Sequence, residues 1–372
     1  MLRKTRQHIL TLIAFYGALA TYLTWPAMAS WGEAVPGSER TDLWNSLWSI
    51  WFVAESLANG TLPYATELLN FPKGGSLLVS DPMGCILATP FVWLLGISRA
   101  YTLLVLAQLT FAGAVAHRFG EALAQRLSTS PAGAWIAGVG YASAPILISG
   151  VHNGTAEAFA GGWPALAALA MFQAAQDGTR RHVLWAVVAL VLTSLSSWYG
   201  VLVAFIFAGT TCLLVKPKAP TSGHPKAPWV ALCLGVMLVL PMALMTHQAA
   251  TKPGNFIGIK TERELATVRR TTGPADPLGY LIPGDYRSPD FREISRYGEA
   301  FFHCHYLGWT LLIGSLLAVR RRGLGFLWLA GGVGLLLSLG PVLARFGSPV
   351  IIMGDRAIPL PYLLVESLPG FS

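Results

Sequence analysis

The sequence is poor in charged residues. Only 12% of its 372 residues are Asp, Glu, Lys or Arg, whereas a soluble domain carries roughly 25%, and 53% are hydrophobic. So little charge cannot cover the surface of a water-soluble protein of this length, and apolar runs recur along nearly the whole chain. These features exclude an ordinary soluble enzyme and predict an all-α, polytopic membrane protein.

Several other signals are missing. The four cysteines are far apart and lack CxxC spacing, which indicates neither a disulfide framework nor a zinc site. The 39 glycines form no Walker or dinucleotide loop, so ATP-driven transport is unsupported, and Gly331, Gly332 and Gly334 are expected to permit close helix packing instead. No basic block with interleaved aromatic residues favours nucleic acid as a partner.

Basic residues are clustered, and their positions predict the topology. Arg3, Lys4 and Arg6 precede the first apolar run, which predicts a cytoplasmic N-terminus. Further short basic connections contain Arg118 and Arg126, Arg180 and Arg181, Lys216, Lys218 and Lys226, and Arg320, Arg321 and Arg322. Placing them all inside predicts spans near 9–30, 101–117, 131–149, 158–175, 183–197, 200–215, 229–246, 303–319 and 324–343.

The apolar stretch 84–97 does not fit this scheme as a full crossing. We interpret it as a re-entrant segment or as the first half of one long tilted helix. The alternative is that Arg99 marks a cytoplasmic turn, which would add a crossing and move the loop containing Arg118 outside. The prediction is therefore 9 or 10 transmembrane helices.

Two large polar loops on the outer face divide the chain into five predicted segments. These are the N-terminal tail and first span (1–30), an acidic first outer loop (31–83), a transmembrane bundle (84–246), a second outer loop (247–302) and the C-terminal spans (303–372). Long loops within compact proteins are usually functional. The sequence ends at Ser372, just after a Pro-rich apolar stretch.

A short helix with interfacial character is predicted in the first outer loop. Asp42 is a suitable N-cap, and Trp44, Trp48 and Trp51 recur at helical spacing after it, which is typical of a helix lying flat at the membrane surface. The residues Asn59-Gly60-Thr61-Leu62-Pro63 are expected to end this helix. Capping alone would explain a carboxylate at Asp42.

The arrangement of a cytoplasmic N-terminus, one span and a large outer loop with an acidic residue resembles the GT-C superfamily of membrane glycosyltransferases. The likeness is to the bacterial branch related to YfhO-type and protein O-mannosyltransferase-type proteins. It is carried by Phe71-Pro72-Lys73-Gly74-Gly75 with Asp81-Pro82, His152-Asn153 with Trp163-Pro164, Ser196-Ser197-Trp198-Tyr199-Gly200, Ala275-Asp276-Pro277, Tyr306-Leu307-Gly308 and Leu337-Ser338-Leu339-Gly340-Pro341.

The resemblance implies transfer of a sugar from a polyprenyl-phosphate donor to a glycan, lipid or protein acceptor at the outer face of a bacterial inner membrane. Asp42 matches the first-loop aspartate, which would act as the catalytic base or as a ligand of a divalent metal. No paired acidic motif surrounds Asp42, so metal dependence stays open. In similar sequences the final Pro-rich stretch runs on into further polar sequence and spans, so the resemblance also implies a truncated or degenerate copy. The leaving lipid phosphate requires cationic neighbours, and Arg263, Arg269 and Arg270 are the candidates.

Three further polar residues are expected to line the outer cavity: Asp81, His152 and Glu157. Their ordinary explanations are helix capping for Asp81 and a loop that reaches water for His152 and Glu157. Two other classes of function remain. One is a transporter or flippase of a lipid-linked substrate, with the broken segments 84–97 and 196–200 forming its pathway, and the other is an inactive fragment or membrane scaffold.

Overall fold

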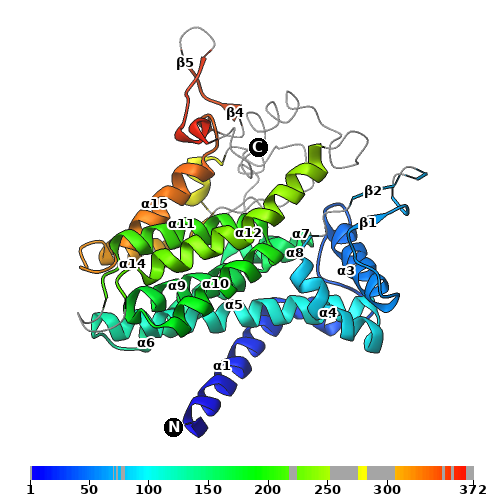
Figure 1. The fold of residues 1–372 in the computed structure, drawn as a ribbon, viewed down its shortest axis with the longest axis horizontal. Coiled ribbons are helices and arrows are strands. Elements are labelled where there is room, and N and C mark those ends of the chain that lie inside the picture. The colour runs from blue at the N-terminus through cyan, green and yellow to red at the C-terminus, as the bar shows by residue number, and fades with distance from the viewer. Residues whose placement is uncertain are drawn as a thin grey trace. The chain divides into compact units, whose positions relative to one another are not determined.

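The computed structural model describes residues 2–69, 71–72, 74–76, 80–217, 224–251, 275–282, 306–345, 348–352 and 356–365. It is mostly helical (Figure 1). The chain divides into two compact units, one formed by Met1–Pro63 with Val79–Val239 and the other by Tyr64–Leu78 with Leu240–Ser372.

The first unit consists of helices. In chain order they are α1 (Leu2–Leu23), α2 (Trp25–Ala29), α3 (Leu43–Ala58), α4 (Pro82–Leu95), α5 (Ile97–Leu127), α6 (Ala132–Ala142), α7 (Pro145–Asn153), α8 (Ala156–Phe159), α9 (Gly162–Asp177), α10 (Arg180–Ser196), α11 (Trp198–Leu214) and the first half of α12 (Ala227–Thr251). Their positions follow the apolar runs of the sequence closely. The helix predicted from Asp42 is confirmed, and it ends directly before Asn59 as expected.

The long helix α5 forms the centre of this unit. It packs against α1, α4, α6 and α9, while α9 also packs against α10 and α11 (Figure 1). Tyr101, Leu109 and Phe159 are fully buried around α5. The interface between α9 and α10 is built largely from small side chains such as Ala167 and Ala186, which allow the two backbones to approach closely.

Helices α4 and α5 are separated by a single residue, Gly96, whose φ of 80° and ψ of 166° are adopted readily only by glycine. The chain therefore turns sharply at this position, and α4 packs back against α5 as well as against α3. With 14 residues, α4 is about 21 Å long, which is shorter than the roughly 30 Å of a bilayer core.

Four helical segments are long and apolar enough to cross a membrane: Ile97–Leu127, Ala132–Asn153, Ala156–Asp177 and Ala227–Met245. Four further apolar helices are shorter, namely Pro82–Leu95, Trp198–Leu214, Trp309–Ala318 and Gly325–Ser338. Among the described residues, helices are therefore present at the predicted spans. Four helical segments are both long enough and apolar enough to cross a membrane.

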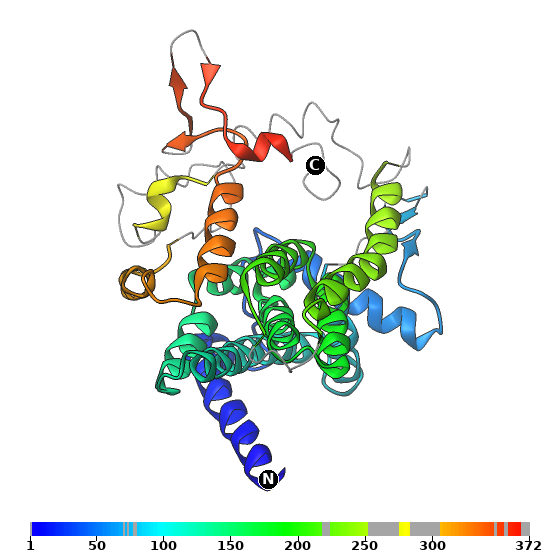
Figure 2. The same cartoon turned by 60° about the vertical axis from the view of Figure 1, so that its left-hand side comes forward.

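The second unit contains the end of α12 together with short elements. These are β1 (Ala65–Thr66), β2 (Gly75–Ser76), η2 (Pro277–Tyr280), α14 (Trp309–Ala318), α15 (Gly325–Ser338), β3 (Ala344–Arg345), β4 (Ser348–Pro349), β5 (Ile351–Ile352), β6 (Arg356–Ala357) and η5 (Pro361–Leu364). The strands form three antiparallel pairs, β1 with β2, β3 with β4 and β5 with β6. Figure 2 shows β3 to β6 and η5 beyond the end of α15. These two-residue strands are a small departure from an all-α chain.

The prediction of close packing at the glycines of α15 is wrong for the described residues. A Cβ added at Gly331, Gly332 or Gly334 would meet no atom within 4 Å. The crowded glycines are in the first unit instead, where a Cβ at Gly138 would lie 1.9 Å from the Tyr16 hydroxyl and a Cβ at Gly162 would lie 2.3 Å from the Phe111 ring. Glycine count along a span does not reveal which face of the helix meets a neighbour.

Candidate functional site

Asp42 occupies the N-cap of α3, but its carboxylate does not cap the helix. The structure shows no side-chain hydrogen bond from Asp42 to the first turn of α3. Instead, Oδ2 of Asp42 accepts a hydrogen bond of 3.3 Å from the Thr155 hydroxyl, and the side chain is only partly buried. Capping therefore does not account for this carboxylate, which faces the turn between α7 and α8.

The start of α3 is fixed to that turn by several polar contacts. The Thr41 hydroxyl donates to the Asn153 carbonyl at 2.6 Å, and the Ser46 hydroxyl donates to the Gly154 carbonyl at 2.6 Å. Ser46 Oγ also accepts from the backbone N–H of Ala156 at 3.2 Å. These bonds join residues more than 100 positions apart and set the position of Asp42.

Gly154 is required by this contact. Its φ of +68° lies in the left-handed region, and a Cβ there would lie 2.7 Å from the Cα of Leu43. The backbone of the α7–α8 turn can approach the first turn of α3 only because this position has no side chain.

Asp81 is a second acidic residue of the site and is buried, with only 1% of its surface exposed. It caps α4, because Oδ1 accepts a bond of 2.8 Å from the Gly84 N–H, which confirms the predicted capping role. Oδ1 also accepts from the Ser196 hydroxyl at 2.9 Å, and Oδ2 accepts from the Gln108 amide at 3.4 Å. Helices α4, α5 and α10 therefore meet at one carboxyl group.

The surroundings of Asp81 favour its protonated form. Burial raises the pKa of Asp81 from 3.8 to about 7, and the negative charge of Glu157 adds to the rise, while the hydrogen bonds from Gly84, Ser196 and Gln108 oppose it. Asp81 can thus exchange a proton near neutral pH.

Glu157 interacts electrostatically with both of the other acidic residues. It belongs to the first turn of α8, is partly buried, and is close enough to both Asp42 and Asp81 for their charges to repel. The structure therefore brings together three carboxyl groups that are widely separated in the sequence. Such a group can accept and donate protons during a transfer reaction.

The remaining predicted site residues are placed differently. His152 is in the last turn of α7 and its side chain is exposed. Arg263, Arg269 and Arg270, which were predicted to lie near a lipid phosphate, fall outside the described residues.

A divalent metal at Asp42 would need ligands that converge. Within the described residues, the three carboxyl groups do not form a set whose ligand atoms all lie within 4.8 Å of one another, whereas His8, His117 and Glu121 do. Carboxylate oxygens suit a hard cation such as Mg²⁺, which keeps several waters and needs few protein ligands. Asp42 and Glu157 therefore offer oxygen atoms of the right type, but the described residues around Asp42 do not form a closed set of ligands.

An apolar cavity of about 390 Å³ lies beside the acidic group, between α4, α5 and the start of α9. Its lining includes Phe91, Phe111, Trp163 and Gln108, and the last of these also bonds to Asp81. The indole Nε1 of Trp163 is buried and has no hydrogen-bond partner among the described residues. The cavity thus has almost entirely apolar walls and a link through Gln108 to a titratable acid.

Sequence reasoning missed four polar residues of the site: Ser46, Gln108, Thr155 and Ser196. Gln108 carried a usable signal, because a polar amide in the middle of a long apolar helix is costly unless it is paired. Ser196 belongs to the motif Ser196-Ser197-Trp198-Tyr199-Gly200, which we interpret from the sequence as a break between two spans and not as a partner of Asp81. The hydroxyls of Ser46 and Thr155 carried no distinguishing signal.

Comparison of the sequence with protein-family models gave no match, and comparison with curated proteins gave no match either.

Proposed function

We propose that this chain is a polytopic protein of a bacterial inner membrane with its N-terminus in the cytoplasm. Its apolar helices of spanning length support this proposal. So do the large apolar side chains that the fold leaves exposed, such as Trp93, Leu94, Met237 and Leu317, since a soluble surface rarely carries so many.

The contacts between α1 and α5 support the predicted topology. His8 lies against Glu121, a Cβ at Gly17 would meet Thr110, and a Cβ at Gly32 would meet Arg99. The two helices therefore run in opposite directions. If α1 runs from the cytoplasm to the outer face, α5 runs from the outer face back to the cytoplasm. A full crossing by α4 would make α1 and α5 parallel, so their opposite directions favour a re-entrant α4.

Within this frame, the activity that the site supports best is sugar transfer of the GT-C type from a polyprenyl-phosphate donor at the outer face. The observation that carries the proposal is the Asp42 carboxylate, which does not cap its helix and lies beside Glu157. In this role Asp42 takes the proton of the acceptor hydroxyl as the bond to the anomeric carbon forms and the lipid phosphate leaves.

The donor would use two other features. The apolar cavity between α4, α5 and α9 suits part of a lipid chain, because its lining is almost entirely apolar. Arg263, Arg269 and Arg270 belong to the predicted second outer loop and remain the proposed counterions of the phosphate.

The test is turnover of labelled polyprenyl-phosphate sugars by the purified protein in lipid vesicles, comparing wild type with Asp42→Asn. We expect turnover to be lost, while the free energy of unfolding changes by less than about 1 kcal/mol because no capping bond is removed. The matched control is Glu55→Gln, which changes an exposed acid on the same helix and should retain turnover. Full turnover by Asp42→Asn would exclude Asp42 as the base.

A transporter of a lipid-linked substrate is the second candidate. It is favoured by the position of Asp81, whose buried carboxyl group lies at the start of the short helix α4 and beside the break between α10 and α11 at Ser197. Interrupted helices around a polar group are typical of transporter binding sites. If the wild-type protein consumes no donor but moves labelled polyprenyl-phosphate sugar between vesicle leaflets, this function replaces the first. Absence of both activities would favour the inactive fragment or scaffold.

A further inference from the structure

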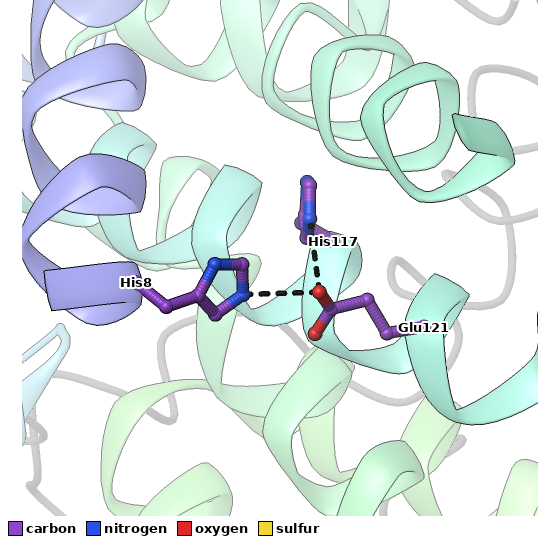
Figure 3. Close-up of side chains that lie close together, drawn as sticks. All are labelled: His8, His117 and Glu121. Atoms are coloured by element: carbon purple, nitrogen blue, oxygen red, sulfur yellow. Dashed lines mark ion pairs between the residues drawn. The ribbon is translucent and has the colours of Figure 1, made fainter. Parts of the chain in front are cut away.

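Two histidines and a glutamate meet where α1 packs against α5, apart from the acidic site. His8 Nε2 lies 3.0 Å from Glu121 Oε1, and His117 Nε2 lies 3.5 Å from the same oxygen. Figure 3 shows the imidazole of His8 reaching from α1 toward the two side chains of α5. All three ligand atoms lie within 4.8 Å of one another.

The fold creates this group from local and distant parts of the sequence. His117 and Glu121 are four residues apart on α5 and therefore project from the same face of the helix. His8 is added only because α1 packs along α5 in the opposite direction. Side chains from two helices thus converge on one point.

A simple ion-pair network is the ordinary explanation, and it leaves one atom unexplained. Nε2 of His8 is buried and makes no hydrogen bond, although it is 3.0 Å from the Glu121 oxygen, because the oxygen lies off the direction of a ring N–H bond. The side chain as a whole is 36% exposed, so another rotamer in contact with water is accessible to it. A cation placed between Nε2 of His8 and Oε1 of Glu121 would give both atoms a bonding partner.

The neighbours of the group hold its members in an orientation suited to a metal. The Tyr16 hydroxyl bonds to Nδ1 of His117 at 3.0 Å, which leaves Nε2 to face Glu121 when Nδ1 carries the proton. The Arg118 guanidinium binds Oε2 of Glu121, which leaves Oε1 for a single metal bond. Partners of this kind are typical of the outer shell of metal sites.

We propose that His8, His117 and Glu121 bind one divalent transition-metal ion, with Zn²⁺ the best match. Two imidazole nitrogens and one carboxylate oxygen are characteristic ligands of zinc. Bonds of about 2.0–2.1 Å in a tetrahedron place ligand atoms about 3.3 Å apart. The observed 3.0 and 3.5 Å separations are close to this value.

Such a site would have two consequences. Three protein ligands leave the fourth position of the ion for water or an added ligand, as in open zinc sites. The ion would also join the N-terminal part of α1 to α5, so that metal binding stabilises the packing of the first helix. Neither consequence depends on the proposed glycosyltransferase activity.

The proposal is tested by titrating Zn²⁺ into the untagged 372-residue protein in detergent micelles after removal of metals. We expect one Zn²⁺ per chain, a higher melting temperature with Zn²⁺ than without it, and at least about tenfold weaker binding in His8→Gln, His117→Gln and Glu121→Gln. The matched control is His182→Gln, since His182 pairs with Asp177 at 3.4 Å outside this group and should bind as wild type does.

Replacing His117 could unfold the protein, because this residue is buried. In that case His8→Gln decides the outcome, since the His8 side chain is partly exposed and its replacement should leave the fold intact. Its melting temperature without metal should match that of wild type. Binding below one Zn²⁺ per ten wild-type chains, or undiminished binding by folded His8→Gln protein, would overturn the proposal.

Discussion

The hydroxyl of Ser196 donates a 2.9 Å hydrogen bond to the carboxyl group of Asp81, although 115 positions separate the two residues. Ser196 is the last residue of α10, and Asp81 is the N-cap of α4. The bond joins the end of one helix to the start of another inside the protein. Much of the local stability around the acidic group should therefore depend on the charge state of Asp81.

Wild-type stability is expected to fall as the pH rises from about 4 to about 7. Burial raises the pKa of Asp81 to about 7, so the folded chain holds this proton more tightly than the unfolded chain does. The resulting stabilisation is complete below about pH 4 and is lost as the pH rises through about 7, a change on the order of 4 kcal/mol. Asp81→Asn should lack this part of the pH dependence.

The measurement is denaturant unfolding in detergent across this pH range. Glu39→Gln is the control, because it changes an exposed acid and leaves the surroundings of Asp81 intact. An identical pH dependence in wild type and Asp81→Asn would show that Asp81 does not titrate in this range.

Ser196→Ala should destabilise the protein more at high pH than at low pH. The Ser196 hydroxyl stabilises the charged carboxylate, and loss of such a bond costs roughly 1–3 kcal/mol once Asp81 has ionised. The pKa of Asp81 should also rise, because this hydrogen bond lowers it. Ser143→Ala, which removes only a bond to the Val139 carbonyl of the preceding turn, should show no such pH dependence.

Gly154→Ala should disturb the acidic site more than Gly60→Ala does. Both glycines have a positive φ, of 68° and 65°, so each alanine carries a similar backbone cost of about 1 kcal/mol. Only at Gly154 would the new Cβ also collide with Leu43, which adds roughly 1–3 kcal/mol. Unfolding experiments on the two variants measure this difference, and equal losses would contradict the observed contact with α3.

Two glycines of α6 give a sharper test of helix packing. A Cβ at Gly138 would lie 1.9 Å from the Tyr16 hydroxyl, whereas a Cβ at Gly133 would meet nothing within 4 Å. Gly138→Ala should therefore lower the melting temperature, while Gly133→Ala should keep or raise it by removing up to about 1 kcal/mol of helix-propensity cost. A stable Gly138→Ala protein would contradict the contact between α1 and α6.

Single cysteines should distinguish the two topologies. In a chain whose native cysteines are replaced by alanine, Thr61→Cys should react with an impermeant thiol reagent added outside intact cells. Thr129→Cys, in the turn after α5, should react only after the membrane is opened. Labelling of Thr129→Cys from outside would instead mean that α4 crosses the membrane.

The sequence by itself determined the helical class and the positions of most helices. Apolar runs bounded by Pro, Gly and charged residues were sufficient, because a helix satisfies its backbone hydrogen bonds locally. The α3 helix after Asp42 and the cap at Asp81 followed from local rules of the same kind. Helix lengths were less accurate: the predicted span 131–149 is interrupted between Ala142 and Pro145, where α6 ends and α7 begins.

The tertiary structure alone decided which polar groups meet. The docking of α3 on the α7–α8 turn brings Asp42 close to Glu157, and the meeting of α4, α5 and α10 positions Asp81. His8 reaches Glu121 through the pairing of α1 with α5. Contacts between distant segments depend on the face that each helix presents and on whether small residues let it approach. One sequence does not encode these choices in any local pattern, so Ser196 and Gln108 became part of the site only when the packed helices were seen together.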